Sequence, residues 1–489
     1  MKNSLLYYAL LTLLYLLCPV VISAQNEPDS VVVSRYFDSI SKDENRLRQF
    51  FAQMPKGGDL HNHLTGSVYA ETYFRLACQD SLWVNMSTGR LFLDSVPGAI
   101  QLKPNMNNLH NIRMTLIDKW SIRNFNPGKF PLGADEYFFG TFGLFGAATK
   151  SHYAELLSEL RKRAAYENVQ YLEIMVSSPS LTVDTYYNEQ LRSAMKSDSL
   201  SAFRSVLDSI YKEFNTKYSS LCDSIVRSNI KFIDTLSLQS KIPNSPVCYY
   251  QFAAKRNAEP FSVFAQLYLG YKCCLQPNSN VVGVNIVSAE NGETSIADYK
   301  WHMEMFNYLD DKFTRGVKKS LHAGELTLGL VEPEEMSNHI SQAVLTAHAN
   351  RIGHGVDIAF ETNSIELLDS MKIRDIPVEI NLTSNEFILG VKDDVHPFML
   401  YRQAGVPMVI STDDPGILRT NLTQQYVLAT LRYGLRYFDI KKLVLNSIKY
   451  SFAPNPNINE LMDKLNKEFT VFEKKWCRNL QIINSWNKP

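Results

Sequence analysis

Short apolar runs that end in polar residues recur along the chain, and each predicts a β-strand. There are eight of them, at 58–63, 169–177, 247–253, 281–288, 318–325, 351–357, 377–384 and 407–414. Longer segments with the spacing of amphipathic helices, such as 336–347, lie between them. Alternating strands and helices predict a parallel sheet. Eight strands in one domain predict that this sheet closes into a (β/α)8 barrel of the TIM type.

The spacing of these runs is uneven. We expect insertions after strands 1 and 2, at roughly 80–150 and 180–241, within a single barrel domain that spans 25–489. The first insertion carries an aromatic stretch from Trp120 to Phe142. Loops that follow barrel strands line the active face, so this insertion is a candidate lid or substrate-binding element. Plain packing, or the surface of a homodimer, is the alternative. Ahead of the barrel, 31–54 predicts one amphipathic helix.

The N-terminus has the pattern of a signal peptide. An apolar run follows Met1-Lys2-Asn3 and ends in small residues at Ser23-Ala24. We interpret 1–24 as a cleaved signal peptide and expect a secreted or periplasmic protein that meets the membrane only through this segment. An uncleaved anchor is the alternative. Six cysteines follow the signal without the spacing of a disulfide framework, which favours buried thiols.

Charge excludes one class of partner. The 489-residue chain has 50 basic and 50 acidic side chains, so its net charge is zero. A nucleic-acid partner usually requires a basic excess, and we expect none here. The sequence leaves the oligomeric state open.

Polar groups gather where the predicted strands end, and these ends meet at one mouth of a barrel. His61 and His63 lie two residues apart, so they point to the same side of the first strand. The other groups are His322 and Glu325 after strand 5, His354 after strand 6, and Asp413 and Asp414 after strand 8. Three imidazoles and a carboxylate suit Zn²⁺. We therefore predict one zinc ion per chain, held by His61, His63, His322 and Asp413.

The same motifs, in the same order, resemble the adenosine deaminase family. They are His61-Asn62-His63, His322-Ala323-Gly324-Glu325, Gly353-His354-Gly355 and Ser411-Thr412-Asp413-Asp414-Pro415, preceded by Met54-Pro55-Lys56-Gly57-Gly58. The signal peptide and the 120–142 segment resemble the exported branch of the family, the adenosine deaminase-related growth factors. The likeness runs from about residue 31 to about residue 426.

The resemblance implies hydrolytic deamination of adenosine and 2′-deoxyadenosine, small-molecule purine nucleosides, to inosine and 2′-deoxyinosine with release of ammonia. It implies that zinc activates the attacking water and that His354 takes the water proton. Glu325 resembles the family acid that protonates the ring nitrogen, which requires a raised carboxyl pKa. Asp413 orients the nucleophile, Asp414 hydrogen-bonds the far purine nitrogen, and Gly324 belongs to the substrate-binding set.

Three positions depart from the family pattern. Asn285 stands where an acidic residue is usual, Ser288 stands where a glycine N–H contacts the purine, and Thr65 replaces an aspartate that contacts the ribose. We expect these changes to affect base and sugar recognition and to leave the metal and proton-transfer groups untouched. They favour, as an alternative, a deaminase of another aminopurine or related compound. A secreted binding or growth-factor-like protein is the third hypothesis. We also expect Ser384 and Asn385 to line the pocket.

Overall fold

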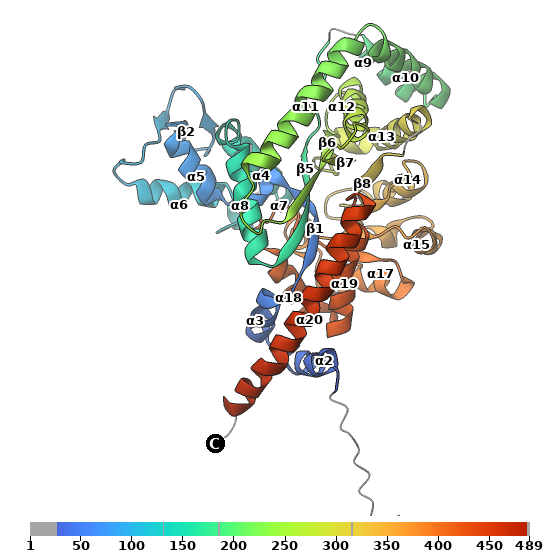
Figure 1. Ribbon diagram of the computed structural model, residues 1–489. Coiled ribbons are helices and arrows are strands. Elements are labelled where there is room, and N and C mark those ends of the chain that lie inside the picture. Colours follow the sequence, from blue (N-terminus) through green and yellow to red (C-terminus); the bar gives the residue numbers. More distant parts are fainter. Residues whose placement is uncertain (1–26, 131, 184–185, 314–315, 487–489) are drawn as a thin grey trace, which may run out of the picture.

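Eight parallel strands form the centre of the molecule. The computed structural model describes residues 27–130, 132–183, 186–313 and 316–486 (Figure 1). The hydrogen-bonded order follows the chain and runs β1 (Gly57–His63), β5 (Val169–Ser177), β6 (Val247–Lys255), β7 (Val281–Val287), β8 (Lys318–Ala323), β9 (Arg351–His354), β10 (Val378–Ile380) and β11 (Met408–Ile410). All eight predicted strands are present, and the predicted barrel class is confirmed.

The barrel closes between its first and last strands. A parallel bridge joins Asn62 to Asp413, just beyond β11. Its two backbone hydrogen bonds run from Asp413 N–H to His61 C=O (2.9 Å) and from His63 N–H to Asp413 C=O (3.1 Å). The residues that close the sheet are therefore the same residues that carry the predicted metal ligands.

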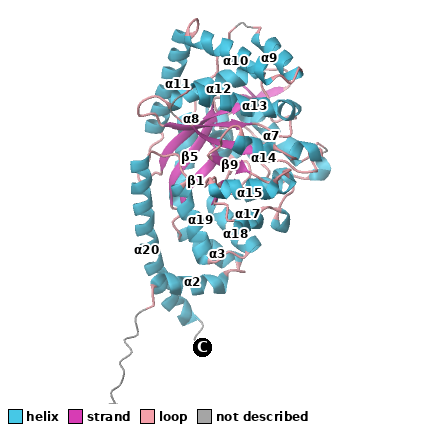
Figure 2. Ribbon diagram, turned by 90° about the vertical axis from the view of Figure 1, so that its right-hand side faces the viewer, coloured by secondary structure: helices cyan, strands magenta, loops and turns pink. Residues whose placement is uncertain are grey.

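Helices cover the outside of the barrel (Figure 2). They are α8 (Tyr153–Tyr166), α12 (Pro260–Cys274), α13 (Glu293–Lys312), α14 (His339–Leu345), α15 (Ser364–Ile373), α16 (Leu382–Leu389), α17 (Phe398–Ala404), α18 (Leu422–Tyr433) and α19 (Tyr437–Lys449). Short 3₁₀ helices lie at Pro333–Met336, Ile358–Phe360 and Asp393–Val395. The helix expected at 336–347 is α14, which is shorter because the 3₁₀ turn before it ends at Met336.

The N-terminal helix expected at 31–54 is two helices, so that prediction is wrong in part. α2 (Asp29–Ile40) and α3 (Glu44–Gln53) are separated by a turn, where the Asp43 side chain accepts a hydrogen bond from the Arg46 N–H and starts the second helix. A long C-terminal helix, α20 (Asn455–Trp486), packs against α2 through Tyr36 and Trp476.

The two insertions differ in structure. The first holds α4 (Leu64–Ser67), α5 (Ala70–Gln79), a small antiparallel sheet of β2 (Trp83–Asn85), β3 (Leu91–Phe92) and β4 (Ala99–Gln101), α6 (Leu109–Lys119), α7 (Ala134–Phe145) and 3₁₀ turns at Pro127–Lys129 and Gly146–Ala148. The second is helical, with α9 (Tyr187–Lys196), α10 (Leu200–Asn215) and α11 (Ser219–Gln239). The small sheet was not predicted, because its strands are too short to show a periodicity.

The predicted signal peptide lies outside the described residues. Within the described part of the chain, none of the helices combines the length and the apolar character needed to cross a bilayer. The six cysteines that follow residue 26 are all unpaired, and four of them are buried, as the spacing predicted.

Candidate active site

The four predicted metal ligands lie together at the C-terminal mouth of the barrel. Their ligand atoms are all within 4.8 Å of one another. The Nε2 atoms of His61 and His63 lie 3.3 and 3.2 Å from Asp413 Oδ1. His63 Nε2 is also 3.3 Å from His322 Nε2. Four side chains from three distant parts of the sequence therefore point at one centre.

The donor set fits a divalent cation. His61 Nδ1 lies 2.7 Å from Glu379 Oε2, and His322 Nδ1 lies 2.9 Å from Asn285 Oδ1. Both acceptors call for an Nδ1–H, which leaves the two Nε2 atoms with lone pairs toward the centre, the usual arrangement behind a metal-ligating histidine. Lone pairs and a carboxylate at this spacing repel one another unless a cation lies between them. Nitrogen and oxygen ligands in this combination suit zinc.

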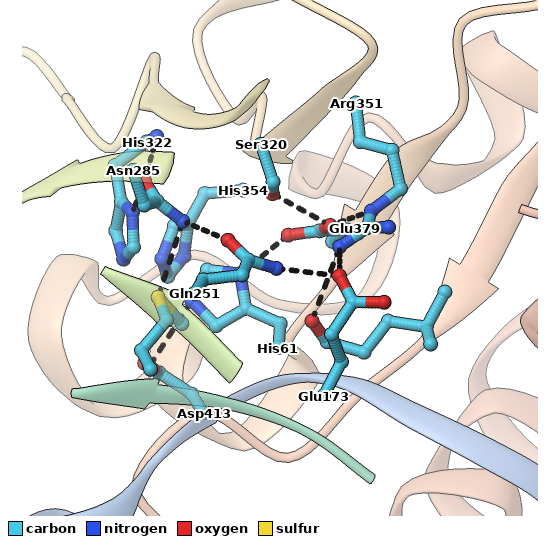
Figure 3. A network of polar contacts seen from close by, with 12 residues as sticks. His61, Glu173, Gln251, Asn285, Ser320, His322, Arg351, His354, Glu379 and Asp413 are labelled. Atoms are coloured by element: carbon cyan, nitrogen blue, oxygen red, sulfur yellow. Dashed lines mark hydrogen bonds and ion pairs between the residues drawn. The ribbon is translucent and has the colours of Figure 1, made fainter. Parts of the chain in front are cut away.

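A connected polar layer lies beneath this centre (Figure 3). Glu379 accepts hydrogen bonds from Ser320 Oγ (2.8 Å) and from the Arg351 guanidinium, which also pairs with Glu173. Burial alone would raise the pKa of Glu379, but Arg351 and His61 lower it to about 2. Glu379 therefore remains a carboxylate that holds the His61 ring in place.

The layer continues to the other side of the centre. Gln251 donates to Glu173 (2.7 Å) and accepts from Asn285 (3.1 Å), which in turn contacts His322. Sequence reasoning missed Glu173, Gln251, Arg351 and Glu379. Their only signal was a polar side chain within an apolar run, and the partners lie on different strands.

The structure corrects our expectation for Asn285. We expected its departure from the family pattern to affect substrate recognition and to leave the metal groups untouched. In the structure its side chain is fully buried, and its Oδ1 lies against His322 Nδ1. The reason is the alternation along β7, which turns this side chain into the barrel. The substitution thus acts on a predicted metal ligand.

Glu325 and His354 lie beside the same centre. Glu325, His354 and Asp413 form a second close group, and Glu325 Oε1 is 3.5 Å from His354 Nδ1. Burial raises the pKa of the Glu325 carboxyl well above its usual range, and the nearby Asp413 and Glu290 carboxylates add to this effect. A raised pKa of this carboxyl is what its predicted acid role requires.

A second polar cluster holds the backbone of Glu325 in place. Glu290 accepts hydrogen bonds from the N–H groups of Gly324 (3.0 Å) and Glu325 (3.2 Å) and from His339 Nδ1 (2.7 Å). Arg256 lies 3.3 Å from the same carboxylate. Gly324, which we assigned to substrate binding, thus has its N–H turned toward Glu290.

Asp414 is buried next to the centre, not exposed in a turn. Burial raises the pKa of its carboxyl well above the usual range, and the Asp413 charge adds to the effect. Its Oδ1 has no hydrogen-bond partner among the described residues. A Cβ placed on Gly66 would come within 1.4 Å of that oxygen, so only glycine leaves room for Asp414 here. A carboxyl with a raised pKa and one unpartnered oxygen suits a ring nitrogen.

Three residues at the mouth have left-handed backbone conformations. They are Ser288 (φ 90°), His354 (φ 67°) and Asp413 (φ 64°). Such conformations cost roughly 1–3 kcal/mol each for residues other than glycine, and they gather at functional sites. Ser288 in particular has a backbone that suits the glycine usual at this position in the family that the motifs resemble.

A cavity of about 460 Å³ opens onto these groups. Its walls include the predicted substrate contacts Thr65 and Ser288, together with four aromatic rings of the first insertion: Phe138, Phe139, Phe142 and Phe145. The first insertion thus supplies one wall of the pocket. Ser384 and Asn385 are not among the lining residues. Asn385 lies behind His354 instead, with its Nδ2 2.9 Å from His354 Nδ1.

Several known proteins resemble this chain in sequence or in fold. Residues 272–468 match the family model described as adenosine deaminase. The N6-methyl-AMP deaminase of Homo sapiens is 25% identical over 85% of this chain and 94% of its own length. The adenosine deaminase of Plasmodium falciparum is 29% identical, over 39% of this chain and 48% of its own length. An amidohydrolase structure from Burkholderia ambifaria with bound Zn is 16% identical with a TM-score of 0.53, covers 88% of this chain and 94% of its own, and shows the shared fold.

The fold and the site define a barrel hydrolase of the deaminase type. The comparisons support the adenosine deaminase family of the amidohydrolase superfamily for this chain, and the relatives in that family act on C–N bonds. The family predicted from the motifs is therefore confirmed.

Proposed function

We propose that the protein is an exported, zinc-dependent enzyme that removes the 6-amino group of adenosine and 2′-deoxyadenosine by hydrolysis. The observation that carries this proposal is the position of the buried Glu325, whose carboxyl pKa is raised by burial, beside four convergent metal-ligand atoms. A carboxyl in this position, next to an activated water, can act as the general acid that protonates a purine ring nitrogen.

The residues would divide the work as follows. His61, His63, His322 and Asp413 would hold a zinc ion, which, when bound, supplies a water molecule of lowered pKa. Glu325 gives its proton to the ring nitrogen next to the reacting carbon. Asp414, also protonated, hydrogen-bonds the far ring nitrogen. The water oxygen bonds to carbon 6 and gives up both of its protons: one replaces the proton that Glu325 gave to the ring nitrogen, and the other goes to the amino nitrogen. The bond from carbon 6 to the amino nitrogen then breaks, and ammonia leaves with the 6-oxo purine.

The direct test is release of ammonia from adenosine, 2′-deoxyadenosine, adenine and AMP, with and without a chelator. The proposal expects turnover of the two nucleosides that the chelator abolishes and zinc restores. Glu325→Gln should abolish turnover while zinc stays bound. Adenosine turnover far below that of the other compounds would overturn the substrate assignment. A biological effect that persisted unchanged in Glu325→Gln would support the binding-protein hypothesis.

One observation favours a second substrate class. Lys255, at the end of β6, is the one lysine or arginine among the cavity-lining residues of the described chain, and no described carboxylate pairs with its ammonium. An unpaired cation in the wall suits a substrate with a phosphate, such as AMP or a related nucleotide. Lys255→Met should lower kcat/KM for AMP by about 10-fold or more, the size of one charge-assisted hydrogen bond, and leave adenosine unchanged. An equal effect on both would remove this candidate.

Export rests on the apolar run that follows Met1-Lys2-Asn3. Fractionation of the native host, with N-terminal sequencing of the mature protein, tests it. The proposal expects a chain that starts near Gln25 in the periplasm or medium. An intact N-terminus on a cell-associated protein would contradict it.

A further inference from the structure

A chain of hydrogen bonds with a fixed direction leads from the backbone of α17 to His354. The Phe398 N–H lies 3.1 Å from His396 Nδ1 and donates to it. A backbone amide can only donate, so His396 Nδ1 must carry a lone pair. The proton of the His396 ring is therefore on Nε2.

The proton on His396 Nε2 fixes which atom donates in the next two hydrogen bonds, from His396 to Asn385 and from Asn385 to His354. His396 Nε2 lies 3.1 Å from Asn385 Oδ1, so the ring donates to the amide oxygen. The Asn385 amide is thereby oriented with its NH₂ group toward His354, and Nδ2 lies 2.9 Å from His354 Nδ1. His354 Nδ1 must then accept a hydrogen bond, and the proton of its ring is on Nε2.

Each alternative leaves a mismatched contact. A flipped Asn385 amide would require both ring nitrogens of His396 to accept a hydrogen bond. A neutral or protonated imidazole carries at least one N–H and cannot do this. A doubly protonated His354 would place its Nδ1–H against the amide NH₂. His354, Asn385 and His396 are 1%, 0% and 3% exposed, so water cannot repair such a mismatch. An unsatisfied buried group costs about 1–3 kcal/mol.

We propose that Asn385 and His396 are positioning residues that hold His354 in the tautomer with its proton on Nε2. His354 then donates a hydrogen bond to the attacking oxygen and does not take its proton, which differs from the role that the family resemblance implies. His354 Nε2 is buried and has no hydrogen-bond partner in the described residues, which keeps this N–H free for the reaction.

The proton balance changes accordingly. Glu325 gives its proton to the ring nitrogen and becomes a carboxylate. The proton of the attacking water, which His354 cannot accept, returns to Glu325, whose carboxyl lies in the same close group as His354 and Asp413. The second proton of the water moves to the amino nitrogen, which then leaves as neutral ammonia. One carboxyl group thus serves the transfer to the ring nitrogen and the first transfer from the water, and no further base is required. This step rests on the proposed deaminase function, whereas the tautomer does not.

The test is ¹⁵N NMR of zinc-loaded protein labelled at histidine, with the His354 signals assigned by their loss in His354→Gln. The proposal expects a proton-bearing Nε2 and a lone-pair Nδ1, which resonate far apart. Asn385→Asp replaces the donor by an acceptor of nearly the same shape. It should move the proton to Nδ1 and lower kcat by about 10²-fold or more, in the range of a lost preorganised donor, with KM little changed.

A proton on His354 Nδ1 in the unmodified protein, or a spectrum that Asn385→Asp leaves unchanged, would overturn the proposal. The matched control is Glu386→Gln, one residue further along α16, where the side chain pairs with Arg432 away from the site. It should alter neither the spectrum nor kcat. If no purine were deaminated at all, the proposed function would fail while the spectrum still reported the tautomer.

Discussion

The layer beneath the mouth of the barrel and the mouth itself are both buried and polar, yet they are built differently. Beneath the mouth, Glu173, Gln251 and Glu379 have all their polar groups paired. At the mouth, His354 Nε2 and Asp414 Oδ1 lack partners among the described residues. Unpaired buried groups are costly, and these two face the cavity, where a ligand can supply the missing partner. The paired layer fixes geometry, and the unpaired groups mark where chemistry takes place.

The largest expected effect comes from the mouth. Asp413→Ala removes the oxygen that two imidazoles face, so zinc should be lost and kcat/KM should fall by more than about 10³-fold, the upper end for one preorganised group. Metal analysis and ammonia release check this. Asp393→Ala, at an exposed position, is the control. Full activity in Asp413→Ala would contradict the metal assignment.

A substitution in the paired layer should weaken zinc binding less than the loss of a ligand does. Glu379→Gln keeps the shape but weakens the acceptor behind His61, so zinc affinity should fall about 10- to 100-fold, as for other groups behind metal ligands. Competition with a chelator measures it. Glu366→Gln, exposed on α15, serves as the matched change and should leave zinc affinity unaltered. If both variants bound zinc like the unmodified protein, the role of the layer would be refuted.

The Glu290 cluster predicts a pH dependence of stability. Burial alone would raise the pKa of Glu290, but Arg256 and His339 lower it to about 2 from the usual 4.5. Because the pKa of Glu290 is lower in the folded state than in the unfolded state, its ionised carboxylate stabilises the fold fully above pH 4.5. The free energy of unfolding should therefore fall by about 3 kcal/mol as the pH drops from 4.5 to 2.

Glu290→Gln should lower the free energy of unfolding by about 3 kcal/mol at neutral pH, because Arg256 is left buried without its partner. It should also flatten the dependence below pH 4.5. Urea unfolding at several pH values measures both. Glu293→Gln, exposed in the first turn of α13, should show neither change. An unaltered pH profile in Glu290→Gln would contradict the assignment.

The smallest effect concerns backbone strain. Ser288→Gly places the residue that tolerates φ 90° at that position, so the free energy of unfolding should rise by about 1 kcal/mol. Thermal unfolding checks it. A loss of stability would show that the Ser288 side chain contributes more than its backbone conformation costs.

Much of the fold could be predicted, because each barrel strand is an apolar run with polar residues at its end. His61, His322 and Asp413 could be found from sequence for the same reason. The paired layer could not, since Glu173 and Glu379 find partners only once distant strands are neighbours. The orientation set by His396 was also hidden, because it depends on one backbone N–H of α17. The break between α2 and α3 was missed because the Asp43 cap interrupts a continuous apolar periodicity.

The most direct test is the metal content and anomalous X-ray scattering of crystals grown with zinc. One zinc ion per chain, with His61, His63, His322 and Asp413 as its ligands, is the predicted result. A fully loaded crystal whose ion lies elsewhere, or in which these four side chains do not share an ion, would contradict it.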